Sequence, residues 1–592
     1  MRHKKLSFKG VAAIFAALTL LGQPLAPAAA QEQKPQVPPP AVRVLVRLVL
    51  VDAIVTEKDG KLVTGLGAQD FTVLEDGKPQ KITNFSFEQP AELARALRSQ
   101  ISPLPQNVTT SRPAYRTPQG TPVILLIDAL NTRATDQARL RMELLRYVNT
   151  QLQPGQQVAV YTLARSLRLL QDFTDDPRLL KAAIESFKPS VSRELQIADL
   201  NQRVPRLSGA NPALDVQRSP RDPAVVLRLM EDFLTEQANV VLDERVGITL
   251  TAFRAIAQSV SGLPGRKSLI WVTGSFPLAT YTRIIDNSAN PNNDPNRVTF
   301  DKLYEDLVRE TGSRLNDARV AVYPVDARGL IGQLLGGAEE SGLTGGGTLM
   351  TGEEYAQNLS LAGRSLQETQ ATLTQFAGDT GGLVYKNQND LDHAVALSVQ
   401  DGASYYLLGY SPEGKPDGKL HKIEVKVNRA GVSVRARRGY YSGASGDSKA
   451  VKQREADVMM AMLPASPGAT GITFDARVVP PAPAAKMKVG VDVLVDLTTL
   501  SSEDAGGGNR RLAVEFHVAA YTSDGKLAGQ HDVAIKPTLK PADFTALQQQ
   551  GIPHHAELEL PPGRFSLRFG VVDQLTGVIG TADLALVLGG PK

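Results

Sequence analysis

Residues 121–132 read TPVILLIDALNT, a run of β-branched and aliphatic residues that ends in one aspartate, Asp128, before a polar turn. The following residues 133–152, RATDQARLRMELLRYVNTQL, have the apolar spacing of an amphipathic helix. A near-continuous apolar strand is typical of the buried centre of a parallel sheet, and such sheets bind ligands at the carboxyl ends of their strands. We therefore expect the binding site of this protein near Asp128.

Strand and helix patterns alternate from residue 121 to about residue 400. This alternation predicts an α/β region with a mainly parallel sheet, helices on both faces and right-handed crossovers. One pair of strands, within residues 158–170, has the form of a hairpin and would add an antiparallel edge strand. The expected strands are residues 123–127, 158–163, 167–170, 269–272, 320–325 and 383–385. The expected helices are residues 135–151, 177–187, 243–261, 300–317, 366–378 and 390–400.

Strand patterns also lie on both sides of the α/β region. Residues 42–88 alternate apolar and polar side chains and contain the turn pairs Asp59-Gly60 and Asp76-Gly77, which predict hairpins. Residues 404–446 contain further strands. Because neither segment is large enough to make a stable sheet alone, we expect the two to pair across the α/β region.

The last part of the chain, residues 470–592, has short strands at the spacing of an Ig-like β-sandwich. Three segments remain, and their composition indicates spacers and linkers. They are the Pro-rich residues 31–41, residues 89–120 and residues 447–469.

Residues 1–30 have the pattern of an export signal. A basic start precedes the apolar residues 11–21, and APAAA then ends at Ala30 with the small residues that a signal peptidase recognises. No later segment reaches about 18 unbroken apolar residues, so we expect no transmembrane segment after cleavage. The absence of cysteine excludes disulfides, thiolate metal sites and cysteine nucleophiles. A periplasmic or secreted location fits these features.

Composition limits the classes of partner. The chain has 592 residues, of which 42% are hydrophobic and 21% charged, as in ordinary globular proteins of several domains. A net charge of +4 is small for this length and predicts no nucleic-acid partner. Arginines gather within residues 193–228, but almost no aromatic residues accompany them, which favours a solvated loop.

Several motifs in order resemble a known family. An aspartate that ends the first strand, a helix, a hairpin and a strand ending in Thr273-Gly274-Ser275 resemble a von Willebrand factor type A domain. More closely, residues 42–443 resemble exported VWFA-related proteins of acidobacteria. The resemblance implies a Rossmann-like von Willebrand type A domain over residues 121–403, inserted between β units as in integrin I-like domains. It rests on VTEKDGKLVTGLGAQDFTVLEDGKPQKITNF, LLIDALNT, PGQQVAVYTLARSLRLLQDFTDD, GRKSLIWVTGSFP, ASYYLLGYSP and VSVRARRGYY.

The resemblance also implies a metal site, because the family holds Mg²⁺ with an Asp-x-Ser-x-Ser loop, a threonine and a second aspartate. Asp128 and Thr132 match the first aspartate and the last hydroxyl, and are the metal ligands that the resemblance implies. Leu130 stands at the middle serine, and Gly274 stands where the second aspartate is expected. This degenerate site leaves Mg²⁺ as the one cofactor to consider. In the alternative, Asp128 caps a helix or accepts loop N–H groups.

The same edge of the sheet carries the expected ligand-binding residues, Asn131, Thr273 and Ser275, together with Asp326. His554 and His555 are adjacent on an expected strand and so point to opposite faces, which argues against a shared metal. The sequence contains no His-Glu-x-x-His, Gly-x-Ser-x-Gly or P-loop motif.

We therefore expect an exported, non-enzymatic binding or scaffolding protein of the cell envelope. Its partner would be another protein or an envelope polymer. The alternative is a secreted hydrolase whose active site is built on the long insertions at residues 188–223 and 329–363.

Overall fold

The structure is a computed structural model of the chain, which divides into the units 1–47 and 48–592. The structure describes residues 48–89, 103–116, 122–196, 223–274, 276, 307–328, 366–367, 369–386, 395–396, 398–399, 401–402, 404–412, 417, 419–442, 448–464, 466–479 and 487–589. The expected signal peptide, the Pro-rich spacer and Ser275 lie outside these residues.

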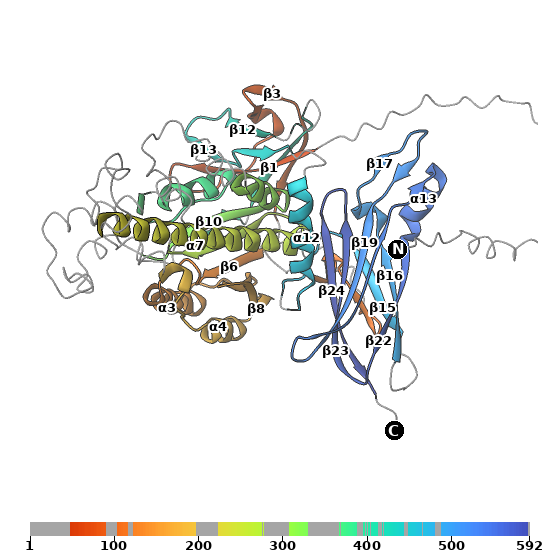
Figure 1. Ribbon diagram of the computed structural model, residues 1–592. Helices are drawn as coiled ribbons and strands as arrows, with labels where there is room; N and C mark the ends of the chain where they lie inside the picture. Colours follow the sequence, from red (N-terminus) through yellow and green to blue (C-terminus); the bar gives the residue numbers. More distant parts are fainter. Residues whose placement is uncertain are drawn as a thin grey trace, which may run out of the picture. The chain divides into compact units, whose positions relative to one another are not determined.

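A five-stranded sheet forms the centre of the α/β region, in the order β10-β9-β6-β7-β8 (Figure 1). Four of its strands are parallel, and β8 is an antiparallel strand at one edge. The mainly parallel sheet with one antiparallel edge strand is thus confirmed. The strands are β6 (Pro122–Asp128), β7 (Gln157–Leu163), β8 (Leu167–Thr174), β9 (Lys267–Thr273) and β10 (Val320–Asp326).

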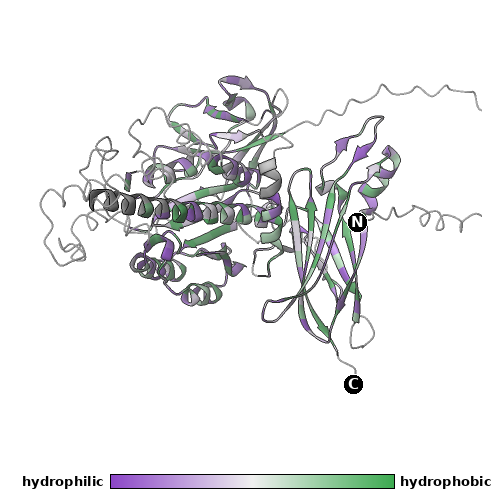
Figure 2. Ribbon diagram, viewed as in Figure 1, coloured by the Kyte–Doolittle hydropathy of each residue, from purple (hydrophilic) through white to green (hydrophobic). Residues whose placement is uncertain are grey.

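Helices cover both faces of this sheet. Consecutive residues of β6 point to opposite faces, and the residues on both faces are apolar and buried. Val123, Leu125 and Ile127 share a core with α3 (Ala134–Thr150) and α4 (Pro177–Ser186). Ile124 and Leu126 belong to a second core, which includes residues of α7 (Pro223–Val260). Figure 2 shows hydrophobic residues along the strands, whereas α3 and α4 carry both hydrophobic and hydrophilic residues.

Helix α7 is longer than expected. The sequence predicted a helix from residue 243, but α7 begins at Pro223 and has 38 residues. Arg228, expected in a solvated loop, therefore lies in this helix. Proline is tolerated at the first helical position because the N–H that it lacks would have no partner within the helix there. Within the described residues, no helix combines the length and the apolar character needed to cross a membrane.

The strands on either side of the α/β region share two sheets, in the orders β13-β1-β11-β4 and β14-β12-β2-β3. Strand β1 pairs with both β11 and β13, so segments about 350 residues apart in the chain are neighbours (Figure 1). One hydrophobic core includes residues of both sheets. The strands are β1 (Val49–Glu57), β2 (Phe71–Glu75), β3 (Lys78–Gln80), β4 (Ile82–Glu88), β11 (Tyr405–Tyr410), β12 (Leu420–Val427), β13 (Val432–Arg435) and β14 (Gly439–Tyr441).

The C-terminal region has two four-stranded antiparallel sheets, β22-β16-β15-β5 and β20-β19-β23-β24, around a single core. A small third sheet, β17-β18-β21, and the helix α13 (Pro541–Gln550) accompany them. The main strands are β15 (Phe474–Val479), β16 (Met487–Val495), β19 (Val514–Thr522), β20 (Leu527–Ile535), β22 (Ile552–Leu560), β23 (Gly563–Asp573) and β24 (Ile579–Leu588). The short strands are β17 (Glu503–Asp504), β18 (Arg510–Arg511) and β21 (Thr538–Leu539).

One strand of these sheets comes from the segment expected to be a linker, residues 89–120. Strand β5 (Val108–Thr110) pairs with β15, and the next residue, Ser111, donates from its hydroxyl to the carbonyl of Ile472 at 2.8 Å. The linker expectation is therefore wrong for this strand. Three residues are too few to show a period, and the partner strand lies more than 360 residues away in the chain.

Helix α12 (Ser448–Met462) lies in the segment expected to be a linker, residues 447–469, and it contacts α7, β23 and β24. Arg254 of α7 forms an ion pair with Asp457 of α12 at 3.3 Å, and both side chains are buried. At the end of α7, the backbone N–H of Gly262 donates to the hydroxyl of Thr470 at 3.0 Å. These contacts join the α/β region to the segment that leads into the C-terminal sheets.

Candidate functional site

Asp128 ends β6 and is fully buried. Its Oδ1 accepts a hydrogen bond from the backbone N–H of Asn131 at 3.0 Å. Its Oδ2 accepts from Asn131 Nδ2, Trp271 Nε1 and Thr273 Oγ1, each at 2.9 Å. Every group that reaches the carboxyl is a donor, an arrangement that an ionised carboxylate accepts without conflict. Burial raises the pKa of Asp128, and the hydrogen bonds from these three residues oppose that rise without cancelling it.

The Asn131 amide links this carboxylate to the guanidinium of Arg245. Asn131 Oδ1 accepts from Nε and Nη2 of Arg245 at 3.0 and 2.9 Å, and Asn131 Nδ2 also donates to Thr249 Oγ1 at 3.0 Å. Arg245 and Thr249 lie one turn apart on α7 and are both buried. One amide therefore connects a buried anion to a buried cation, and the positive charge near Asp128 comes from the protein itself.

Leu130, Thr132 and Gly274 have structural roles around this carboxylate. Leu130 packs in the core that includes residues of α7. Thr132 Oγ1 accepts from the backbone N–H of Gly274 at 2.8 Å. A Cβ atom at Gly274 would lie 3.2 Å from the carbonyl oxygen of Asn131, so a larger residue there requires a small displacement of its neighbours.

These contacts do not fit a magnesium ion at Asp128. Mg²⁺ prefers octahedral coordination by oxygen ligands. Here the single carboxylate already accepts hydrogen bonds from Asn131, Trp271 and Thr273, and the amide of Asn131 is held by the Arg245 guanidinium. The arrangement supports the alternative in which Asp128 accepts loop N–H groups.

The structure brings Asp128, Asn131, Thr132 and Thr273 together, because β6, which leads into the loop of Asn131 and Thr132, is adjacent to β9. However, Asn131 is only 1% exposed and Thr273 is fully buried, so both hold the loops in place and do not present a surface to a partner. Asp326, at the end of β10, is also buried, and the Nε and Nη2 atoms of Arg328 donate to it at 2.9 and 2.8 Å. The expectation of accessible ligand-binding groups at Asn131 and Thr273 is corrected accordingly.

Sequence reasoning missed the contributions of Trp271 and Arg245. Both lie within elements that the sequence predicted, a strand and a helix. Their contacts with Asp128 and Asn131 join residues 143 and 114 positions apart. No local pattern identified these two residues as partners of the Asp128 loop, because they come from distant parts of the chain.

A second candidate site is a cavity of ≈ 400 Å³, within the range of about 300–1,000 Å³ that is common for small-molecule sites. It is bordered by the β7–β8 hairpin, the last turn of α7 and the strands β23 and β24. Arginine and aspartate side chains contribute to its lining, namely Arg168, Asp172, Arg568 and Asp583.

No protein-family model matches this chain, and no curated relative does. Among solved structures, the chain is similar to an aerotolerance-related membrane protein from Bacteroides fragilis, with 11% identity and a TM-score of 0.21 over 48% of this chain and 99% of that one. The conserved hypothetical protein BatB from Bacteroides thetaiotaomicron has 13% identity and a TM-score of 0.20 over the same shares. Proximal thread matrix protein 1 from the mussel byssus has 11% identity and a TM-score of 0.21 over 48% of each chain. Values this low support no argument about function.

Proposed function

We propose that this chain is an exported, non-enzymatic binding or scaffolding protein of the cell envelope. Its α/β region would be a von Willebrand type A domain that meets another protein or an envelope polymer at the carboxyl edge of the parallel sheet. The C-terminal sheets would form an Ig-like β-sandwich that offers a further surface.

The hydrogen-bond network of Asp128 carries this proposal. Its donors and the Arg245 guanidinium fix the loops at the carboxyl edge of the sheet without a metal ion. A loop held in this way presents its outer residues in a constant arrangement, which lowers the entropy that is lost when a partner binds. The order of elements along the chain also supports the von Willebrand assignment. A central strand that ends in aspartate is followed by a helix and then by an antiparallel hairpin.

The outer residues of this edge are therefore the proposed contact surface. Thr135 lies in the first turn of α3, after the β6 loop, and Ser166 lies in the β7–β8 turn. Both are exposed. Exposed substitutions at such positions usually change stability by less than about 0.5 kcal/mol, so they test binding separately from folding.

The test measures capture of a partner from envelope extracts, followed by titration of the purified partner. We expect Thr135→Trp with Ser166→Trp to weaken binding at least tenfold with an unchanged melting temperature. Gln153→Trp is the matched control, because Gln153 is exposed at the opposite edge of the sheet, before β7. Equal binding by all variants would move the contact surface away from the carboxyl edge.

A secreted hydrolase is the second candidate function, and the ≈ 400 Å³ cavity favours it because carboxylates line a space of suitable volume. Peptide, glycan and ester substrates offered to the purified chain distinguish the two functions. Turnover that Asp172→Asn abolishes would establish the hydrolase and overturn the binding proposal.

A further inference from the structure

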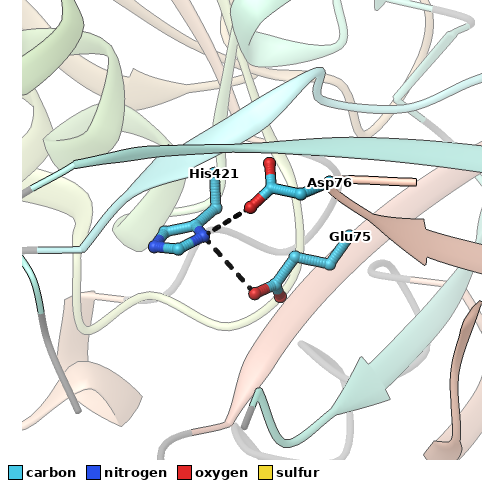
Figure 3. A group of neighbouring side chains, drawn as sticks. All are labelled: Glu75, Asp76 and His421. Atoms are coloured by element: carbon cyan, nitrogen blue, oxygen red, sulfur yellow. Dashed lines mark hydrogen bonds and ion pairs between the residues drawn. The ribbon is translucent and has the colours of Figure 1, made fainter. Parts of the chain in front are cut away.

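Glu75, Asp76 and His421 form a cluster in the sheet β14-β12-β2-β3, outside the α/β region (Figure 3). Glu75 ends β2, and Asp76 begins the turn to β3. Glu75 is paired with Ile423 of β12, and His421 lies two positions before Ile423. Because alternate residues of a strand point to the same side, Glu75 and His421 project from one face of the sheet.

The potential ligand atoms of this cluster are close together. His421 Nδ1 lies 2.8 Å from Asp76 Oδ2 and 3.6 Å from Glu75 Oε1, and all three atoms lie within 4.8 Å of one another (Figure 3). In a tetrahedral zinc site with bonds of about 2.0–2.1 Å, the ligand atoms are about 3.3–3.4 Å apart. Shifts of well under about 1 Å in the His421 contacts would reach that geometry.

The other ring nitrogen of His421 has its own carboxylate. Asp417 Oδ1 lies 3.1 Å from Nε2, and the ring stacks on Tyr440 at 5.3 Å. An Nε2–H that donates to Asp417 leaves a lone pair on Nδ1, directed at two carboxylates. Either a proton on Nδ1 or a bound cation therefore lies between this nitrogen and the carboxylates. Metal-binding histidines commonly donate their second N–H to a carboxylate in this way.

Glu75 supplies an independent observation. Its side chain is buried, with 7% of the residue exposed, and Tyr440 donates from its hydroxyl to Oε1 at 3.2 Å. Its other oxygen, Oε2, accepts no hydrogen bond of ordinary geometry among the residues that the structure describes, although the Tyr410 hydroxyl is close enough to interact with the Glu75 carboxyl. A buried carboxylate oxygen without a donor is unfavourable, and a bound cation would satisfy it.

We propose that Glu75, Asp76 and His421 bind a divalent transition-metal ion of the zinc type, oriented by Asp417. One imidazole nitrogen and two carboxylate oxygens suit such an ion, and three protein ligands leave a fourth position for water. The ion would join the β2–β3 turn to β12. This site is separate from the proposed partner surface, and its presence does not depend on that function.

The test titrates untagged, metal-free full-length chain with ZnCl₂ by calorimetry and follows the melting temperature. We expect one Zn²⁺ per chain and a higher melting temperature with the ion. Glu75→Gln and His421→Gln should each weaken binding at least tenfold, and Asp417→Asn should weaken it by about 10–100-fold. His555→Gln is the matched control, because His555 forms a 2.7 Å contact with the single carboxylate of Asp492 at an exposed site.

Two results would overturn the proposal. One is no saturable binding by the unmodified chain, and the other is binding that His421→Gln and His555→Gln affect equally. If His421→Gln does not fold, Asp76→Asn takes its place, because the Asp76 side chain is about half exposed and its loss disturbs packing less. Co²⁺ bound in place of Zn²⁺ provides an independent spectrum of the coordination geometry, which must change in the Asp76 variant.

Discussion

The Asp128 carboxyl lies at the end of β6, where Asn131, Trp271 and Thr273 donate to it and the Arg245 guanidinium reaches it through Asn131. A buried charge is stable only when its partners are fixed in place. Asn131 follows β6, Trp271 and Thr273 belong to β9, and Arg245 belongs to α7, so the network joins these three elements. This network is therefore expected to contribute mainly to folding.

Asp128→Asn should lower the free energy of unfolding by about 3 kcal/mol. The new amide replaces an acceptor by a donor, and each buried donor left without an acceptor costs about 1–3 kcal/mol. Urea denaturation of the purified variant measures the loss. Thr273→Val is the control, because it removes one donor and keeps the carboxylate, and it should cost about 1 kcal/mol. An Asp128→Asn variant as stable as the parent would contradict a structural role for the network.

Lys267, at the start of β9, predicts a dependence of stability on pH. Its Nζ donates to the carbonyls of Leu263 and Gly265 at 2.7 and 3.0 Å, and burial lowers its pKa to about 7. The unfolded chain holds this proton up to a pH of about 10.4, so between these two values the unfolded state binds more protons than the folded state. The contribution of Lys267 to stability should therefore rise as the pH increases from 7 toward 10.

The comparison uses Lys267→Met, which cannot titrate. Free energies of unfolding measured in urea at pH 6, 7, 8 and 9 should rise with pH in the parent relative to the variant. A constant difference between the two proteins over this range would show that Lys267 keeps an ordinary pKa in the folded state.

The shared sheets make the N-terminal strands essential to strands that come much later in the chain. Strand β11 lies between β1 and β4, and β12 lies between β2 and β14. Removing β1 to β4 would expose the backbone groups on both edges of β11 and on one edge of β12. Unpaired strand edges of this kind associate with other chains.

A truncation that starts at Pro118 should therefore aggregate. It lacks β5 as well, so the edge of β15 is also exposed. Size-exclusion chromatography with light scattering measures the oligomeric state. Removing only residues 1–47 leaves all the described strands in place and should give a protein that melts like the parent. A monomeric Pro118 truncation with the parent's melting temperature would show that the late strands are stable without these partners.

Contacts between α7 and α12 link the α/β region to the C-terminal sheets. The Arg254–Asp457 pair is buried on both sides. Breaking a buried ion pair from one side leaves a charge without its counterion, which costs about 3–5 kcal/mol, whereas replacing both partners by apolar residues is often neutral. This asymmetry makes the pair a test of how the two regions are coupled.

Arg254→Met should destabilise the chain by about 3 kcal/mol, and Arg254→Met with Asp457→Leu should recover most of that loss. Calorimetric melting of the single and double variants provides both values. Lys488→Met is the control, because the Lys488–Glu557 pair is exposed and its loss should change stability by less than about 1 kcal/mol. A double variant less stable than Arg254→Met would indicate that the pair holds the two regions by more than charge.

Much of the architecture was predictable from the order of neighbouring residues. The apolar run that became β6, the hairpin β7–β8 and the helix α3 all follow from hydrophobic period and turn chemistry. Because Asp128 follows an apolar run, the sequence also predicted a polar group at the carboxyl end of this strand. Each of these features depends on residues within about 20 positions of one another, so the spacing of apolar side chains along the chain predicts it.

Tertiary contacts decided what those residues do. Arg245 reaches Asn131 from 114 positions away, and His421 meets Asp76 across 345 positions. Neither pairing leaves a local pattern, because strand register and helix packing set it only when the whole chain has closed around its cores. Only the packing of the folded chain determines which distant polar groups are removed from water together. The arrangement of donors around Asp128 and of carboxylates around His421 therefore exists only in the folded chain.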